Sequence, residues 1–563
     1  MLECRPLPHP SPHRPGRSVS QYGEVCGNIL PDPRRVMTPM ARRVRQSRLT
    51  RRQFVAGAAA TMASGTLLRF ALPAAGAPAP APAQAPARPS AGGVLRCTLG
   101  AEPTTLDPHR AQSLFDYDVK DAIFAALLSD EFTDGPRGTL AESWESPNAS
   151  TYIFKLRRGA RFHDGSPVTS DSVKSSYERV ATTGIGLIRS IPDQVASVDV
   201  LDPQTVRFTL KAPNAAFLID VADMAIVPRD FDPQRPVGAG PFQFVEWVRL
   251  RHVRLKKFPG YFREGRPYLD EVVFMPTPDE NQKITLLETG NVEFTDTVPL
   301  PRVRDVERGG RFVVYGIPTG VSPSSYYMLT RADRPPLDNL KLRQAINLGV
   351  DRKAMLEVLF GKSTLKSNII PPKHWAFNPE SLSFNERDVT RARKLLAEAG
   401  HSSGLTLQVK HLTSRAEFFP LAQLFQANMA EIGIKIDVIP LEIGIWLNQV
   451  LVQRDFQLGL SGIIPRYDPD VMLGEQYSIR RINGRAIGWR HALLEKQIDQ
   501  GRAVVTQEER KRIYRHAQLI VQWEAPGFVL NERPILSAAA QSVQGFKPDV
   551  RQLIRFEDVW LKR

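Results

Sequence analysis

The chain has 563 residues, of which 42% are hydrophobic and 24% are charged. This is the composition of a globular protein with room for two or three domains, and it excludes a disordered, collagen-like or polytopic membrane chain. The net charge of +15 does not indicate a nucleic-acid binder, because residues 1–77 hold 12 Arg, no Lys and 3 acidic residues, and the remaining 486 residues carry only +6. We therefore expect no nucleic-acid partner.

The first predicted element resembles an export signal. Residues 37–77 contain a cationic stretch, an apolar run rich in Ala and Gly over 54–68, and then an Ala/Pro region, which is the layout of a signal peptide. The sequence TRRQFV at 50–55 resembles the twin-arginine motif, which directs folded proteins across the bacterial inner membrane. The apolar run has about 15 residues, whereas a spanning helix needs roughly 20. We therefore expect the signal peptide to be removed on export, which leaves a soluble protein in the periplasm.

The segments on either side of this signal have simpler interpretations. We interpret residues 1–36 as an upstream stretch that precedes the natural start or is disordered, and residues 78–93 as a Pro/Ala linker. Cys4 and Cys26 precede the signal, so Cys97 is the one cysteine of the mature chain and an internal disulfide is not expected. Cys97 lies in an apolar run at 94–99, which predicts a strand with a buried structural thiol.

The next predicted elements form a hairpin. Apolar residues alternate over 151–156 and 205–210, and an apolar stretch covers 195–200, so all three read as strands. Asp202-Pro203 supplies a turn between the second and third of these segments.

The second half of the chain predicts α/β units. A helix capped by Asp388 and ended by Gly400 carries one apolar stripe. A strand at 405–412, a helix at 417–432 and a strand at 434–438 then give the spacing of a βαβ crossover, in which helices cover a sheet.

Several motifs of enzymes are present only in fragments. Gly361-Lys362-Ser363 has the end of a phosphate-binding loop, but Leu356 stands where the first Gly is needed. Gly459 precedes Ser461 as in a nucleophile elbow, but the second Gly is missing. The histidines do not have the spacing of a zinc helix. We therefore expect no catalytic residues, no metal and no cofactor.

Seven short stretches, in sequence order, resemble the family 5 extracellular solute-binding proteins, the peptide/nickel-type receptors of ABC importers. They are EPTTLDP at 102–108, LAESWE at 140–145, FHDGSPVT at 162–169, VGAGPF at 237–242, PPLDN at 335–339, DPD at 468–470 and EAP at 524–526. The resemblance covers about residues 94–563. It implies capture of a peptide or peptide-like solute in a cleft between two lobes and its delivery to a membrane permease with its ATPase.

The resemblance also implies a fold and its boundaries. It predicts an α/β, two-lobed, hinged type II periplasmic-binding-protein fold with an inserted α+β domain. Lobe one would comprise 94–118, 213–320 and 525–563, the inserted domain 119–212, and lobe two 321–524. The chain would cross between the lobes near Gly320 and near Glu524, and the protein would be a monomer.

The expected ligand site departs from the family pattern in one place. In the dipeptide and oligopeptide receptors, an Asp shortly before the Asp-Pro pair binds the peptide α-amino group, and alignment on Asp468-Pro469 puts Pro465 there. The neighbouring Arg466 would suit an anionic group through its planar fork. The residues that we expect at the ligand are Glu102, Thr104, Ser113, Phe115, Tyr327, Ser461, Gly462, Arg466, Tyr467 and Trp489.

Three alternatives stay open at this point. Because the usual amino anchor is absent, the solute could be a non-peptide, either anionic or sugar-like. An exported enzyme with a cofactor is a weaker alternative, since fold alone does not settle function. A sensor subunit that presents a ligand to a membrane receptor would have the same fold and cleft.

Overall fold

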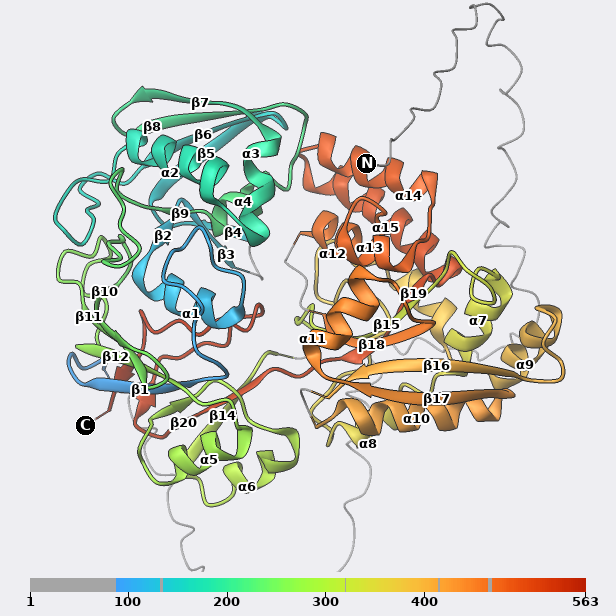
Figure 1. Ribbon diagram of the computed structural model, residues 1–563. Coiled ribbons are helices and arrows are strands. Elements are labelled where there is room, and N and C mark those ends of the chain that lie inside the picture. The colour runs from blue at the N-terminus through green and yellow to red at the C-terminus, as the bar shows by residue number, and fades with distance from the viewer. Residues whose placement is uncertain (1–87, 132–134, 319, 414–415, 464–467, 563) are drawn as a thin grey trace, which may run out of the picture. The chain divides into compact units, whose positions relative to one another are not determined.

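The structure is a computed structural model that describes residues 88–131, 135–318, 320–413, 416–463 and 468–562. Helices and strands alternate through this part of the chain (Figure 1). Its α-helices are α1 (Leu114–Ile123), α2 (Ser170–Thr183), α3 (Ile191–Gln194), α4 (Phe217–Asp223), α5 (Glu280–Glu288), α6 (Val303–Glu307), α7 (Leu340–Gly349), α8 (Ala354–Val358), α9 (Val389–Glu398), α10 (Phe418–Glu431), α11 (Ile443–Trp446), α12 (Pro469–Tyr477), α13 (Ile482–Ile487), α14 (Ala492–Ala503) and α15 (Gln507–Glu524). The predicted signal, residues 37–77, the upstream segment and most of the linker lie outside the described residues.

A seven-stranded sheet forms around the first strand. Its order is β10 (Phe242–Val248), β11 (His252–Lys257), β12 (Glu271–Pro276), β1 (Val94–Leu99), β13 (Phe294–Thr295), β20 (Leu536–Ala540) and β14 (Phe312–Gly316). β1 is parallel to both of its neighbours, β12 and β13. Cys97 is fully buried in this strand, and burial raises the pKa of its thiol well above the usual value, so the prediction of a buried structural thiol is confirmed.

A five-stranded sheet contains the predicted crossover. Its order is β17 (Ile434–Leu441), β16 (Leu405–Leu412), β18 (Leu458–Ile463), β15 (Ser325–Thr330) and β19 (Gly527–Glu532). β16 and β17 are parallel along their whole length, and α10 between them packs on both, which confirms the βαβ unit. Asp388 caps α9 by accepting from the Arg391 N–H, and Gly400 has the positive φ of a residue that ends a helix.

A four-stranded antiparallel sheet confirms the predicted hairpin. Its order is β5 (Ala141–Asn148), β6 (Thr151–Leu156), β8 (Thr205–Leu210) and β7 (Val195–Asp202). Phe154 and Phe208 lie buried on one face with ring centroids 5.8 Å apart. Three small pairs complete the strands: β2 (Ala125–Ala126) with β9 (Ala225–Ile226), β3 (Leu128–Glu131) with β4 (Gly135–Gly138), and β21 (Val543–Gln544) with β22 (Trp560–Leu561).

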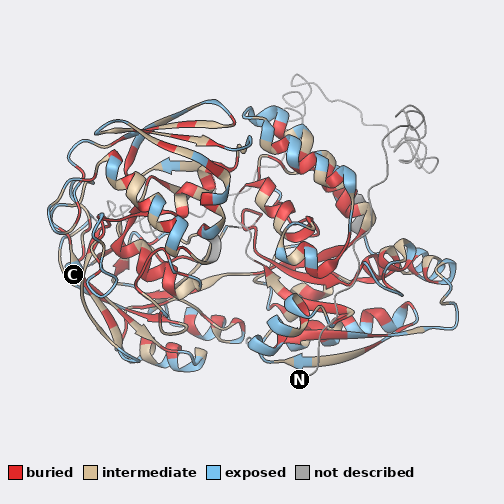
Figure 2. Ribbon diagram, turned by 45° about the horizontal axis from the view of Figure 1, so that its top comes forward, coloured by how far each residue is buried: buried red, intermediate tan, exposed pale blue. Residues whose placement is uncertain are grey.

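Buried residues concentrate in the sheets and on the helix faces that cover them (Figure 2). The largest apolar cluster surrounds the five-stranded sheet, and separate clusters belong to the four-stranded and seven-stranded sheets. Each sheet therefore has a hydrophobic core of its own. Within the described residues, none of the helices is both long enough and apolar enough to cross a bilayer.

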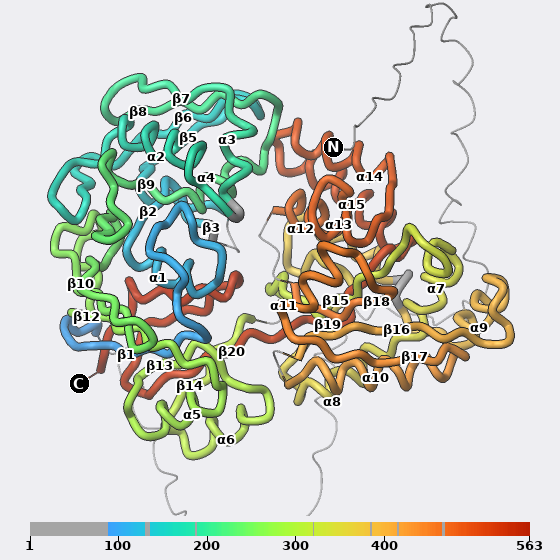
Figure 3. The backbone as a smooth tube through the Cα atoms, viewed as in Figure 1, coloured from blue at the N-terminus to red at the C-terminus, as the bar shows by residue number. Residues whose placement is uncertain are grey.

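The chain passes between the seven-stranded and five-stranded sheets at two places (Figure 3). It leaves β14 at Gly316 and enters β15 at Ser325, and it leaves β19 at Glu532 and enters β20 at Leu536. The Arg533 N–H donates to the Ser324 carbonyl, so the two passages are hydrogen-bonded to each other. The second passage falls at 533–535, later in the sequence than the predicted crossing near Glu524.

The turn at 237–241 is held by a histidine from the 162–165 turn. The Gly238 N–H donates to His163 Nδ1 at 3.2 Å, so the ring proton is on Nε2, which donates to the Gly240 carbonyl at 3.1 Å. A Cβ at Gly238 would lie 2.1 Å from the Ile123 carbonyl oxygen, a distance that only glycine avoids. Gly165 has a φ of 89° and its N–H donates to the Phe162 carbonyl, so the 162–165 stretch is a turn.

We expect the stability of the folded protein to fall as the pH is lowered from about 6.5 towards 4. Burial lowers the pKa of His163 from 6.5 to about 4, and it does the same for the fully buried His109. Between these values the unfolded state binds more protons than the folded state, so stability decreases with falling pH, by on the order of 1–3 kcal/mol per histidine. Urea unfolding at pH 7 and pH 4.5 measures the change.

The variant His163→Gln should reduce this pH dependence, because its side chain does not titrate. An equal pH dependence in the parent and in His163→Gln would contradict the assignment.

Candidate functional site

A narrow cavity lies where the second passage meets both sheets. Its volume is about 60 Å³. One wall comes from α1, the start of α5, the loop after β13, β20 and Gln552, and the other comes from Glu417 and the passage itself. The lining residues are Leu114, Phe115, Asp118, Glu280, Asp296, Thr297, Val298, Pro299, Leu300, Glu417, Arg533, Pro534, Ile535, Leu536 and Gln552.

The start of α1 is fixed by one carboxylate. Asp116 accepts from the backbone N–H of Thr104 at 2.6 Å and from that of Ser113 at 2.9 Å. Ser113 in turn caps α1 by accepting from the Asp116 N–H. This capping box holds the first turn of α1, which carries Phe115 and Asp118 into the wall of the cavity.

Two carboxylates on this wall have different surroundings. Asp118 accepts from the Ile554 N–H at 3.0 Å, and burial raises the pKa of its carboxyl well above the usual value. Asp296 is paired with Lys283, whose ammonium lies 2.8 Å from its Oδ1, and it also accepts from the Thr98 hydroxyl at 2.8 Å. The charge of Asp296 is therefore compensated, and burial favours the neutral form of Asp118.

The opposite wall offers groups of both charges. Glu417 precedes α10 and accepts from the Tyr326 hydroxyl at 3.1 Å through Oε1. Arg533 follows β19 directly, and its side chain covers Gly462 in β18, where a Cβ would lie 3.1 Å from Arg533 Cδ. Ser461 is buried beside Gly462. The absence of a side chain at Gly462 therefore gives Arg533 its place at the cavity.

The other predicted ligand residues lie in different surroundings. Glu102 accepts from the Trp247 indole N–H and from the Leu250 N–H, so it ties the β10–β11 hairpin. Tyr327 is fully buried in β15 and packs edge-on against Tyr477, with ring centroids 6.1 Å apart. Trp489 stacks against His491 at 5.0 Å. Arg466 and Tyr467, like Pro465, lie outside the described residues. Of the eight predicted residues that the structure describes, only Phe115 is among those that line this cavity.

Sequence reasoning missed Asp118, Asp296, Glu417 and Arg533. Glu417 was visible only as the first residue of a predicted helix. Arg533 had one available signal, since the run Asn531-Glu532-Arg533 places polar residues directly after apolar ones at the end of a strand. Asp118 and Asp296 reach the cavity through contacts with segments far apart in the sequence, namely the Ile554 N–H for Asp118 and the pairing of β13 with β1 and β20 for Asp296, and such contacts leave no local pattern.

The fold and this position of the cavity define a class of protein. The structure is the two-lobed α/β type II fold of periplasmic binding proteins, as solved structures show. ABC transporter-associated periplasmic binding protein DppA of Helicobacter pylori, solved with the peptide STSA, gives a TM-score of 0.71 at 24% identity, covering 84% of this chain and 99% of that one. The binding protein AgaA of A. tumefaciens R10, solved with agropinic acid, gives a TM-score of 0.71 at 28% identity, with the same coverage of 84% and 99%.

The sequence comparison identifies the family. The family model of the bacterial extracellular solute-binding proteins, family 5 (middle region), matches residues 135–483. The glutathione-binding protein GsiB of Shigella flexneri serotype 5b (strain 8401) is 28% identical over 490 residues, which cover 82% of this chain and 94% of that protein. The chain belongs to the family 5 extracellular solute-binding proteins, which bind solutes for transport.

Proposed function

We propose that the chain is the periplasmic substrate-binding component of an ABC importer. It captures a peptide or peptide-like solute between its two lobes and delivers it to a permease and ATPase in the inner membrane. Membership of family 5 supports this function, as does the relative named for glutathione, itself a peptide. Export by the twin-arginine machinery, periplasmic location and action as a monomer, without a catalytic step, belong to the same proposal.

The observation that carries the peptide assignment is the pair Glu417 and Arg533 at one cavity. A peptide with free ends carries an ammonium and a carboxylate. A carboxylate and a guanidinium that approach from one wall complement these two charges, and hydrogen bonds between charged groups are the strong ones. On this proposal Glu417 supplies the acid that Pro465 cannot, and Phe115 packs against the apolar part of the ligand.

The size of the cavity supports capture by closure. At about 60 Å³ it is well below the roughly 300–1,000 Å³ of small-molecule sites. A peptide therefore enters only when the walls separate, and the passages from β14 to β15 and from β19 to β20 join the two parts that move. A ligand that contacts both walls then shifts the population towards the closed form.

The test is calorimetric titration of the purified protein with glutathione and with short peptides, each compared with its N-acetylated form. Glu417→Gln should weaken the binding of a free peptide by about tenfold or more, which is the loss of one hydrogen bond to a charged group. It should leave the binding of the N-acetylated form unchanged, because that ligand has no ammonium. Glu178→Gln, on the exposed face of α2, is the matched control. Equal loss for both ligand forms would refute the role of Glu417.

A non-peptide anionic solute is the second candidate. The observation in its favour is that AgaA, a structural neighbour at 28% identity, was solved with agropinic acid. Arg533, and Arg466 as predicted from the sequence, would then bind the anionic group. Titration with agropinic acid separates the candidates, because Arg533→Gln should weaken its binding while Glu417→Gln should not.

A further inference from the structure

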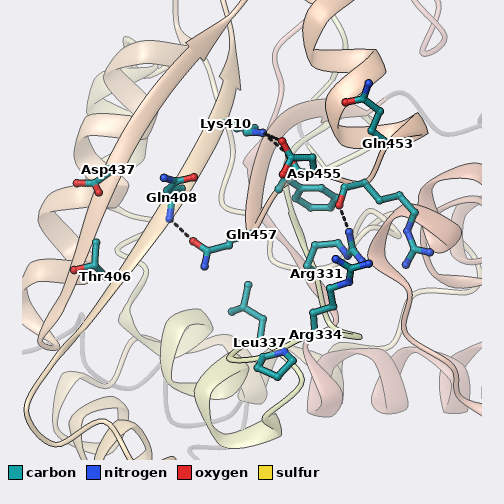
Figure 4. Close-up of a pocket in the computed structure, with 13 residues that line it drawn as sticks. Arg331, Arg334, Leu337, Thr406, Gln408, Lys410, Asp437, Gln453, Asp455 and Gln457 are labelled. Atoms are coloured by element: carbon teal, nitrogen blue, oxygen red, sulfur yellow. Dashed lines mark hydrogen bonds and ion pairs between the residues drawn. The ribbon is translucent and has the colours of Figure 1, made fainter.

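A second, larger cavity lies on the five-stranded sheet and shares no lining residue with the first. Its volume is about 490 Å³, which is within the range of small-molecule sites, roughly 300–1,000 Å³. Strands β16 and β17 form its floor, and the segments 331–337 and 453–457 form its walls (Figure 4). We propose that this cavity binds a small polar solute through an oxyanion, either a phosphate or a carboxylate, held by Arg331, Arg334 and Arg454.

The cavity exists because one strand begins late. β18 starts at Leu458, which pairs with Val409, so no residue of β18 lies beside Thr406 or Gln408 of β16. The Gln408 N–H is satisfied by the Gln457 side chain instead, at 2.8 Å. The floor of the cavity is therefore built of hydroxyl and amide groups, which can hydrogen-bond a polar solute.

The guanidinium groups on the wall are held in place by one carboxylate. Arg331, with a side chain only 4% exposed, donates through Nε to Asp333 Oδ1 at 2.8 Å, and Arg454 donates through Nη2 to Asp333 Oδ2 at 2.6 Å. Burial opposes the ionisation of Asp333, but the hydrogen bonds and charges of the two arginines outweigh it and lower the pKa of its carboxyl. Asp333 is thus an anion that orients two cations.

The backbone around this triad is adapted to it. Arg454 has a φ of 59°, a left-handed conformation that is costly for a residue with a side chain and that concentrates at functional sites. The backbone carbonyl of Arg454 accepts a hydrogen bond from Arg331 Nη1. Gly488 approaches from the other side, where a Cβ would lie 2.3 Å from Asp333 Cγ and 2.4 Å from Arg454 Nη2. A side chain at position 488 would therefore overlap the ion pair of Asp333 and Arg454, which glycine avoids.

The charge of the cavity is unbalanced towards the positive. Lys410 is paired with Asp455 at 3.0 Å, and Asp437 with Lys435 at 3.3 Å, so these charges compensate each other. The remaining group is three guanidinium ions, those of Arg331, Arg334 and Arg454, against the one carboxylate of Asp333. An excess of guanidinium forks favours the planar or tetrahedral oxyanions that accept two hydrogen bonds at once.

One guanidinium of this group is open to a ligand. Arg334 is exposed at the mouth of the cavity, and within the described part of the chain no partner of its side chain is found. Arg331 and Arg454 line the same cavity, so an oxyanion that pairs with Arg334 lies in the positive field of all three guanidinium groups.

The experiment is titration of the full purified protein with inorganic pyrophosphate and, separately, with citrate. Binding of at least one probe with a stoichiometry of one is expected. Arg334→Gln should raise its dissociation constant by about tenfold or more, and so should Arg454→Gly, which keeps the left-handed backbone. Arg251→Gln, an exposed arginine in the β10–β11 turn, is the matched control and should change nothing.

The outcomes distinguish a phosphate ligand from a carboxylate ligand, and binding in this cavity from binding in the narrow cavity. Binding of pyrophosphate alone assigns a phosphate site, and binding of citrate alone assigns a carboxylate site. Glu417→Gln should leave either result unchanged, since Glu417 belongs to the other cavity. The proposal is overturned if neither probe binds, or if Arg251→Gln weakens binding as much as Arg334→Gln does, because the effect would then be one of net charge.

Discussion

Replacing Arg510 by alanine should lower the free energy of unfolding by about 3–5 kcal/mol, because it leaves a buried carboxylate without its partner. Arg510 donates from Nη1 to Asp468 Oδ2 at 2.9 Å and from Nη2 to Asp468 Oδ1 at 2.7 Å, and each side chain is 8% exposed. Burial by itself lowers the pKa of Arg510, but the Asp468 carboxylate outweighs that effect and raises it. Asp468 also caps α12 by accepting from the Asp470 N–H, so the lost partner disturbs a helix end as well.

Urea unfolding of Arg510→Ala measures the loss. The matched control is Arg207→Ala, which breaks the half-exposed ion pair with Asp199 and should cost no more than about 1 kcal/mol. If the two variants lost the same stability, burial of the Arg510 pair would not matter.

Replacing Lys283 by methionine should be similarly costly, again about 3–5 kcal/mol. The Lys283 side chain is 2% exposed and that of Asp296 is 9% exposed, so the substitution leaves a carboxylate unpaired in the wall of the narrow cavity. The double variant Lys283→Met/Asp296→Asn should regain about 2 kcal/mol of this loss, because the amide is neutral and can still accept from the Thr98 hydroxyl.

A thermodynamic cycle over the parent, Lys283→Met, Asp296→Asn and the double variant gives the coupling of the two residues. A double variant no more stable than Lys283→Met would show that the cost lies in the packing of Lys283 and not in the unpaired charge. The cycle is to be measured by urea unfolding at pH 7.

Local elements could be predicted because their patterns are local. The alternation in 405–412 and the glycine at 433 depend on residues a few positions apart, and the structure has this strand with the predicted bounds. The crossover followed from spacing alone. The order of the seven-stranded sheet could not be obtained in this way, since β20 pairs with β13 and β14, which lie more than 200 residues earlier.

The candidate site was harder to predict than the fold. Phe115 was expected at the ligand and does line the narrow cavity. Glu102 and Thr104 had the right residue types, but hydrogen bonds to Trp247 and to Asp116 account for their polar groups. A sequence shows which side chains can bind a solute, whereas the competing partners that occupy them come from tertiary contacts. Glu417 and Arg533 were missed for the converse reason, since their places at the cavity depend on where two strands end.

The position of β20 between β13 and β14 determines when the protein can finish folding during its synthesis. β13 and β14 are synthesised early. β20, the strand that pairs with both of them, comes directly after the passage at 533–535. About 220 residues separate β14 from β20, so at roughly 5–20 residues per second the ribosome needs on the order of 10–40 s to supply the missing strand. During that interval the edges of β13 and β14 lack their partner, and unpaired strand edges template aggregation. The nascent chain therefore has a defined period in which a chaperone has an edge to bind.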